Sequence, residues 1–166
     1  YVKLALPNVG PAPDLKVEPT PELIARGAYL ANHVSLCMDC HSTRDWTRYS
    51  GPLLSHTLGQ GGEVFDQASG FPGRFVARNI TPDGIGSFTD GELYRAITTG
   101  VTRDGSPIFG IMPYVNYGQM DPEDIKAIIA YIRTLAPISH TTPAHDPDFP
   151  VNILINTMPK KAEPRT

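Results

Sequence analysis

Both cysteines of the 166-residue chain lie in one short segment, SLCMDCH, and a histidine directly follows the second one. The thiols belong to Cys37 and Cys40, and the imidazole belongs to His41. Thiols and imidazoles bind metal ions, and a close pair of thiols can also form a disulfide or a redox couple. The spacing therefore indicates that this segment carries the chemistry of the chain.

Three common interpretations of a Cys-x-x-Cys pair are a disulfide, half of a zinc site and a thioredoxin-like redox pair. A structural zinc site needs four ligands, whereas the other histidines are scattered along the chain, at His33, His56, His140 and His145. A thioredoxin-like pair lies in a βαβ pattern, which the surrounding sequence lacks. A chance pair beside an unrelated histidine stays open as an alternative.

The order Cys-x-x-Cys-His is also the pattern of covalent haem attachment. Each thiol adds to one vinyl group of the ring, and the adjacent imidazole ligates the iron. If the segment is helical, steps of three and four residues place Cys37, Cys40 and His41 on one face. The sequence therefore predicts one covalently bound haem c, held by these three residues.

A helix is predicted from about Pro21 to the cysteines, with Thr20 as its N-cap. Its apolar residues recur at steps of three and four, which forms one core-facing stripe. Gly27 interrupts this stripe at a cost of roughly 1 kcal/mol relative to alanine. We therefore expect a close approach by another backbone or a large ring at Gly27.

Two later segments carry the signals of helix ends. In FTDGELYRAITTG, Thr89 and Glu92 form a capping box and Gly100 ends the helix. In MDPEDIKAIIAYIRTLAP, Asp121 is the cap, and Pro137 follows the last apolar position. The sequence therefore predicts a modest helical frame.

The segment 42–88 between these helices is rich in glycine, and only short stretches such as RFVARNI could form strands. A loop of this length is consistent with wrapping around a prosthetic group that supplies apolar surface. We divide the chain into an extended N-terminal arm (1–19), a central domain (20–136) and a proline-rich C-terminal tail (137–166).

Composition restricts the partners. The net charge is −3 and the basic residues are scattered, so we expect no nucleic-acid partner. No apolar run reaches the roughly 18 residues needed to span a bilayer, and the start lacks the apolar stretch of a signal peptide. We expect a soluble domain, with a possible membrane tether outside the given chain.

Beyond the attachment motif, the chain resembles the monohaem class I-type cytochromes c. The helix with Gly27 and the final helix with Tyr131 and Leu135 look like the crossed N- and C-terminal helices of that family. NITPDGIGSFTDGELYRAITTGVTRDG and MPYVNYGQMDPEDIKAIIAYIRTL are similar to cytochrome subunits and domains of bacterial membrane-bound dehydrogenases. The resemblance covers about residues 20–136. It implies an all-α, small cytochrome c fold with crossed helices around a covalent haem and long ordered loops.

The second axial ligand is sought among four methionines. Met38 lies inside the attachment motif, Met158 lies in the tail, and Met120 abuts the cap of the last helix. Met112 precedes Pro113, which holds it in extended backbone. The resemblance also places the ligand at a Met-Pro pair. We predict His41 and Met112 as the metal ligands; Met112 as core filler and Met120 as ligand are the alternatives.

Support for the cofactor is expected from five further residues. GPL, with Pro52, resembles the family segment whose proline carbonyl accepts a hydrogen bond from the ligating histidine. Other candidates near the haem propionates, where arginine offsets carboxylate charge, are Trp46, Arg48, Arg74 and Arg78.

The predicted function is one-electron transfer by a carrier that is not itself an enzyme, in a bacterial respiratory or dehydrogenase-linked chain. A haem sensor or enzyme with an open distal site is the alternative. The expected partners are redox proteins: a dehydrogenase or quinone-side donor, and an oxidase or cytochrome acceptor. Because the resembled family acquires its thioethers outside the bacterial inner membrane, we expect a periplasmic or membrane-anchored protein facing the periplasm.

Overall fold

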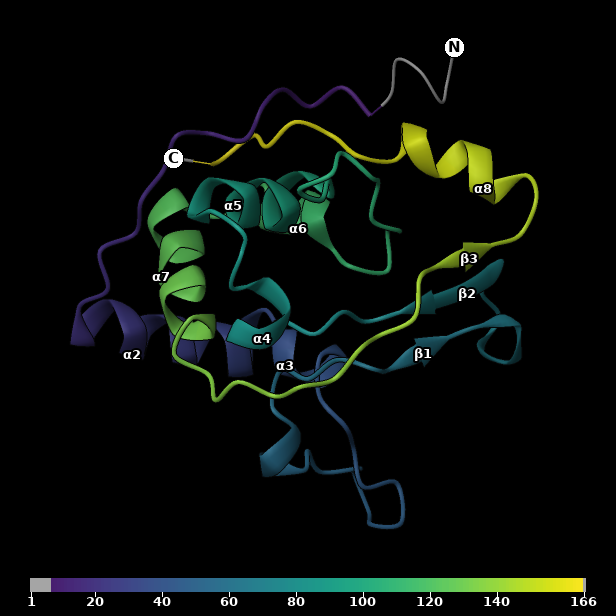
Figure 1. Ribbon diagram of the computed structural model, residues 1–166, viewed down its shortest axis with the longest axis horizontal. Helices are drawn as coiled ribbons and strands as arrows, with labels where there is room; N and C mark the ends of the chain where they lie inside the picture. The colour runs from purple at the N-terminus through teal and green to yellow at the C-terminus, as the bar shows by residue number, and fades with distance from the viewer. Residues whose placement is uncertain (1–6, 166) are drawn as a thin grey trace.

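The computed structural model describes residues 7–165 (Figure 1). The helices are α2 (Pro21–Tyr29), α3 (Cys37–Cys40), α4 (Pro82–Ile85), α5 (Asp90–Thr99), α6 (Tyr114–Tyr117), α7 (Pro122–Ile132) and α8 (Val151–Leu154). The strands are β1 (Val64–Phe65), β2 (Gly73–Val76) and β3 (Asp146–Pro147). In the part of the chain that the structure describes, no helix is both long enough and apolar enough to span a membrane.

Helices α2 and α7 pack directly against each other at Gly27. A Cβ atom at Gly27 would lie 1.8 Å from the carbonyl oxygen of Ala127 and 2.9 Å from Cβ of Tyr131. Only glycine fits a backbone contact this close. The predicted close approach at Gly27 is confirmed, and it brings the first long helix against the last one.

The predicted helix signals act as expected. The Thr20 hydroxyl accepts a hydrogen bond from the Leu23 N–H at the start of α2. Thr89 and Glu92 form the capping box of α5. Gly100 ends α5 with a φ of 76°, in the left-handed region. The first helix is shorter than predicted: after Tyr29 the backbone widens into a π-helical turn, Leu30–Val34.

The fold is not all-α, so that prediction is wrong. Strands β1, β2 and β3 form a three-stranded antiparallel sheet in that order. Val64 pairs with Val76 in β1 and β2, and Gly73 pairs with Pro147 in β2 and β3. Strands of two to four residues are too short to show alternation in the sequence, and β3 joins from a segment some seventy positions later. Their pairing is therefore a tertiary effect that local pattern does not reveal.

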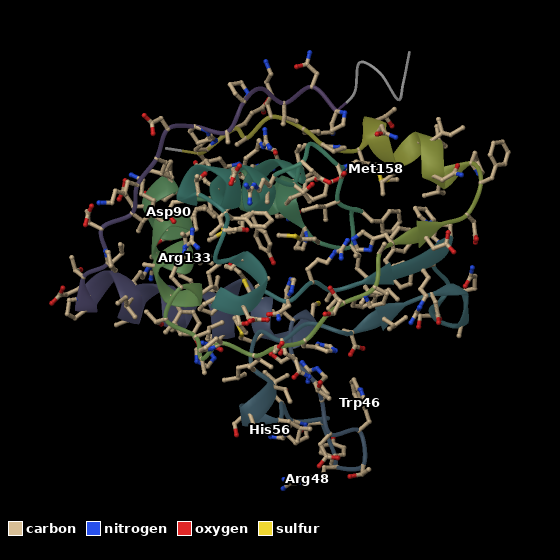
Figure 2. All side chains as sticks on the ribbon, in the orientation of Figure 1. Trp46, Arg48, His56, Asp90, Arg133 and Met158 are labelled. Atoms are coloured by element: carbon tan, nitrogen blue, oxygen red, sulfur yellow. The ribbon has the colours of Figure 1, made fainter. Side chains whose placement is uncertain are left out.

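The apolar core lies between α2, α5 and α7. Its buried cluster comprises Leu30, Ala31, Met38, Ile85, Leu93, Ile125, Ala127, Ile128, Ile129 and Ile132. Arg133 fastens the edge of this core, because its guanidinium donates to Asp90 Oδ1 at 2.9 Å (Figure 2). The other carboxylate oxygen of Asp90 accepts from the Val17 N–H at 2.9 Å, which ties the N-terminal arm to α5.

Residues 137–165, predicted as a tail, return across the molecule. The chain passes the loop after β2, forms β3, and then forms α8 at the far end (Figure 1). Near the C-terminus, the Glu163 N–H donates to the Gly118 carbonyl at 2.9 Å. The segment therefore contributes to the tertiary structure along its length.

Candidate cofactor site

A large cavity of about 860 Å³ lies between α3 and the loop that connects α5 to α6. Its walls come from α3, β1, β2, α4, α5, the connecting loop, α6, α7 and part of the C-terminal segment. Most of these side chains are apolar, among them Phe75, Leu93, Ile97, Ile108 and Ile128. A cavity of this size and lining suits a large, mostly apolar ligand.

The attachment motif forms one wall of this cavity. Cys37, Cys40 and His41 all line it, and they come from α3 and the residue that follows. Leu36, in the left-handed conformation with φ of 51°, turns the chain from the π-helical turn into α3. The turn thereby presents both thiols and the imidazole to the same space.

The two cysteines do not have the environment of a reactive thiol pair. They are free thiols in the structure. Burial raises the pKa of Cys37 to about 12, and burial also raises the pKa of Cys40. Redox-active pairs instead have lowered pKa values and a high thiolate fraction. These pKa shifts therefore count against a thioredoxin-like role.

Residues 7–165 do not form a zinc site either. Among residues 7–165, no group of three or more His, Cys, Asp or Glu side chains is arranged to hold a metal ion. A structural zinc ion would need two further protein ligands beside Cys37 and Cys40.

His41 is oriented by a backbone carbonyl. Its Nδ1 lies 2.6 Å from the carbonyl oxygen of Arg78, which can only accept, so Nδ1 donates its proton there. Burial lowers the pKa of His41, while the Arg78 carbonyl opposes this shift. The ring is therefore held neutral with Nε2 as the nitrogen that can bind a metal.

The acceptor predicted for His41 was the carbonyl of Pro52, and this differs in the structure. The Pro52 carbonyl accepts from the Asp45 N–H at 2.9 Å, within a hairpin-like loop. Arg78, on the segment after β2, supplies the carbonyl instead. Any residue offers a backbone carbonyl, so the residue type carried no signal for this contact.

Among the four methionines, all of which the structure describes, only Met112 lines the cavity. Met38 is fully buried in the core, and the Met120 sulfur lies 3.8 Å from the Ser35 hydroxyl. Met158 lies beyond α8 in the C-terminal segment (Figure 2). Met112 is in a turn before α6, where its carbonyl accepts from the Tyr114 N–H at 2.8 Å. Met112 is thus the one thioether available to a ligand in this cavity.

In comparisons with known proteins, no protein-family model matches the chain, but several curated proteins are similar to it. The chain is 31% identical over 135 residues to the gluconate 2-dehydrogenase cytochrome c subunit of Pantoea cypripedii, covering 79% of the chain and 27% of that protein. It is 32% identical over 150 residues to the fructose dehydrogenase cytochrome subunit of Gluconobacter japonicus, covering 82% of the chain and 27% of that protein. The chain is a homologue of dehydrogenase cytochrome c subunits.

The chain is also similar to a third protein, a diheme cytochrome c-type protein of Cereibacter sphaeroides. It is 33% identical over 119 residues, which cover 70% of the chain and 38% of that protein. The chain spans about a quarter of the length of the two dehydrogenase subunits. The predicted resemblance to dehydrogenase-linked cytochromes, which are electron carriers rather than catalytic subunits, is confirmed.

The residues of this cytochrome homologue fit a haem c. The two thiols and the His41 ring face one cavity, and its apolar lining suits a porphyrin ring. A neutral imidazole and a thioether are the axial donors that proteins use to hold haem iron in electron carriers. The donor set and the space therefore agree with the cofactor that the motif predicts.

The remaining residues predicted to contact the haem do not all lie at the cavity. Arg78 lines the cavity, whereas Trp46, Arg48 and Arg74 do not. Trp46 is 70% exposed and lies with Arg48 in a lobe that projects from the body (Figure 2). Arg74 is exposed on β2, in register with Asp146 of β3. The sequence suggested that arginine side chains lie near the haem propionates, but it did not indicate which of these arginines faces the cavity.

Many of the cavity residues were not identified from the sequence, among them Arg103 and His145. Arg103 lines the cavity from the loop that carries Met112, and its guanidinium pairs with Glu92 at 3.5 Å. His145 lines it from the C-terminal segment, where its Nδ1 accepts from the Val76 N–H at 3.1 Å. Arg103 could have been found, because a loop that carries the predicted ligand Met112 is expected to border the cofactor. His145 could not, since its segment lies far from the motif in sequence.

Proposed function

We propose that this chain is a one-electron transfer protein with a single covalent haem c, ligated by His41 and Met112. The observation that carries the proposal is that Cys37, Cys40, His41 and Met112 line the same apolar cavity, and that Met112 is the one methionine to do so. The homology to cytochrome c subunits of dehydrogenases supports electron transfer as the role.

Each group has a distinct task in this proposal. The haem supplies the one-electron chemistry. The thiols fix its position, and the Arg78 carbonyl, 2.6 Å from His41 Nδ1, keeps the imidazole in one tautomer and orientation. Met112 contributes a soft, neutral sulfur that favours ferrous iron. The apolar walls exclude water, so little rearranges when the charge changes.

The proposed partners follow from the relatives. We propose a dehydrogenase or another quinone-side protein as donor and an oxidase or second cytochrome as acceptor, with the site facing the periplasm. The names of the relatives, which are subunits of gluconate 2-dehydrogenase and fructose dehydrogenase, support a dehydrogenase-linked chain.

Two measurements on the protein expressed with haem-attachment machinery test the proposal. The denatured mass should exceed that of the bare chain by one haem. The ferrous protein should not bind carbon monoxide, because both axial positions of the iron are filled in the proposed site. A mass increase of zero or two haems, or ready binding of carbon monoxide, would contradict the proposed carrier; carbon monoxide binding would favour the sensor or enzyme.

Met112→Ala tests the ligand. Opening the iron should let the ferrous variant bind carbon monoxide, remove the sulfur-to-iron absorption band of the ferric form and lower the reduction potential. Met120→Ala is the matched control, since Met120 does not line the cavity, although its sulfur lies 3.8 Å from the hydroxyl of the lining residue Ser35. It should leave all three properties unchanged. Changes in the Met120 variant but not in the Met112 variant would transfer the ligand role to Met120.

A further inference from the structure

Asn79 is a buried side chain that joins two distant parts of the chain. It is 7% exposed and uses its whole amide. Its Nδ2 donates to the carbonyls of Ile138 at 2.8 Å and His140 at 3.2 Å. Its Oδ1 accepts from the Thr81 N–H at 2.9 Å and from the Thr81 hydroxyl at 2.8 Å. A buried amide with all partners satisfied fixes the geometry of both segments.

The segment that Asn79 holds, residues 138–145, is here named the strap. It runs along the chain that follows β2 and is attached at several points. The Arg78 guanidinium donates to the Thr142 carbonyl at 3.3 Å, and the Val76 N–H donates to His145 Nδ1 at 3.1 Å. Four strap residues also line the cavity: His140, Thr141, Thr142 and His145. The strap is therefore both a wall of the cavity and a brace for residues 76–79.

The braced residues are the ones that orient His41. Arg78, whose carbonyl accepts from His41 Nδ1, directly precedes Asn79. On the other side, the ring of His140 donates from Nδ1 to the Gln60 carbonyl at 2.9 Å. The neighbouring Gly61 N–H donates to the His41 carbonyl at 2.9 Å. The strap thus contacts both chain segments that hold His41, one against its ring and one against its backbone.

We propose that the strap positions the proximal histidine through Arg78, with Asn79 as the positioning residue. The proposal rests on the proposed function, in which His41 ligates haem iron. A hydrogen bond from Nδ1 raises the basicity of the ligating ring and stabilises ferric iron, so a displaced Arg78 carbonyl would weaken that effect. The strap then sets the reduction potential without touching His41 itself.

Asn79→Ala in the haem-loaded protein tests the proposal, because it removes both strap hydrogen bonds, together with the two that Oδ1 accepts from Thr81, without changing charge. Asn156→Ala is the matched control: its Nδ2 also donates to a backbone carbonyl, that of Ile153 at 3.0 Å, but it lies outside the strap. The measurements are the reduction potential and the exchange rate of the His41 Nδ1 proton by NMR. Both are made at pH 8, where free histidine is neutral, and well below the thermal midpoints.

Asn79→Ala should raise the potential and speed exchange of the Nδ1 proton by about tenfold or more, whereas Asn156→Ala should match the wild type. His140→Ala provides a second variant, which removes the hydrogen bond to the Gln60 carbonyl at an exposed position, and it should move both properties in the same direction by less. Wild-type values in every variant that folds would overturn the strap's role. A wild type without covalent haem, or without His41 as ligand, would instead refute the proposed function.

Discussion

Gly27→Ala is the most direct test of how the helices are held together. In an isolated helix this change stabilises the helix by roughly 1 kcal/mol, because alanine restricts the unfolded backbone and favours the helical conformation. In this protein the new Cβ atom would lie 1.8 Å from the Ala127 carbonyl oxygen. An ordinary carbon–oxygen contact is about 3.3 Å, so α2 and α7 would have to separate by about 1.5 Å.

Neither side of this clash can rotate away, because the Cβ atom and the carbonyl oxygen are both fixed by backbone. Overpacking of this kind costs about 1–3 kcal/mol, from which the gain in helix propensity is subtracted. Because both groups are fixed, the cost lies in the upper part of this range, about 2–3 kcal/mol, so we expect a net loss of about 1–2 kcal/mol. This loss is equivalent to a fall in the thermal midpoint of about 2–8 °C for a chain of this size.

Thermal and denaturant unfolding of the haem-loaded protein, followed by circular dichroism, measures this loss. Gly110→Ala is the control, since a Cβ atom there meets nothing within 4 Å. It should change the free energy of unfolding by less than about 0.5 kcal/mol. A midpoint that stays the same or rises in Gly27→Ala would refute the packing of α2 on α7 at this residue.

Two further predictions concern the free energy of unfolding. Asp90→Ala should lower the free energy of unfolding in urea by about 1–3 kcal/mol, because it leaves the half-buried Arg133 without its carboxylate. Asp124→Ala, which breaks an exposed ion pair, should lower it by less than about 1 kcal/mol. Equal losses in the two variants would contradict this prediction. The pKa of His145 is lowered below its unfolded value, first by burial and then by the charge of Arg78. Below about pH 6.5 the unfolded chain therefore binds more protons than the folded protein, and the free energy of unfolding falls. His145→Gln should lessen the loss between pH 7.5 and 5, and parallel curves for variant and wild type would count against this.

The sequence was a good guide wherever the determinant is local. Thr20, Thr89 and Asp121 each cap a helix as predicted, because a capping side chain contacts backbone only two or three residues away. Gly27 was informative for a related reason: a glycine that breaks an apolar stripe at a cost in propensity signals a close contact.

Contacts between distant segments could not be predicted. The sheet depends on β3, a two-residue strand that contains a proline and has no pattern of its own. The acceptor for His41 is a carbonyl, which every residue possesses, so Arg78 could not be distinguished from Pro52. Asn79 illustrates the same limit, since the carbonyls that accept from its Nδ2 lie about sixty residues later in the chain. The roles of the metal ligands themselves, His41 and Met112, remain predictions that the experiments above address.

The projecting lobe, residues 43–57, has a consequence for how this sequence can change. Its two arms meet at the base, where the Leu54 N–H donates to the Thr43 carbonyl and the Asp45 N–H donates to the Pro52 carbonyl, each at 2.9 Å. None of residues 43–57 lines the cavity. Because the ends are already pinned together, extra residues at the tip would add only the slowly growing entropy of a longer closed loop. The lobe is thus the natural place for insertions, peptide tags or loop exchange that leave the cofactor site intact.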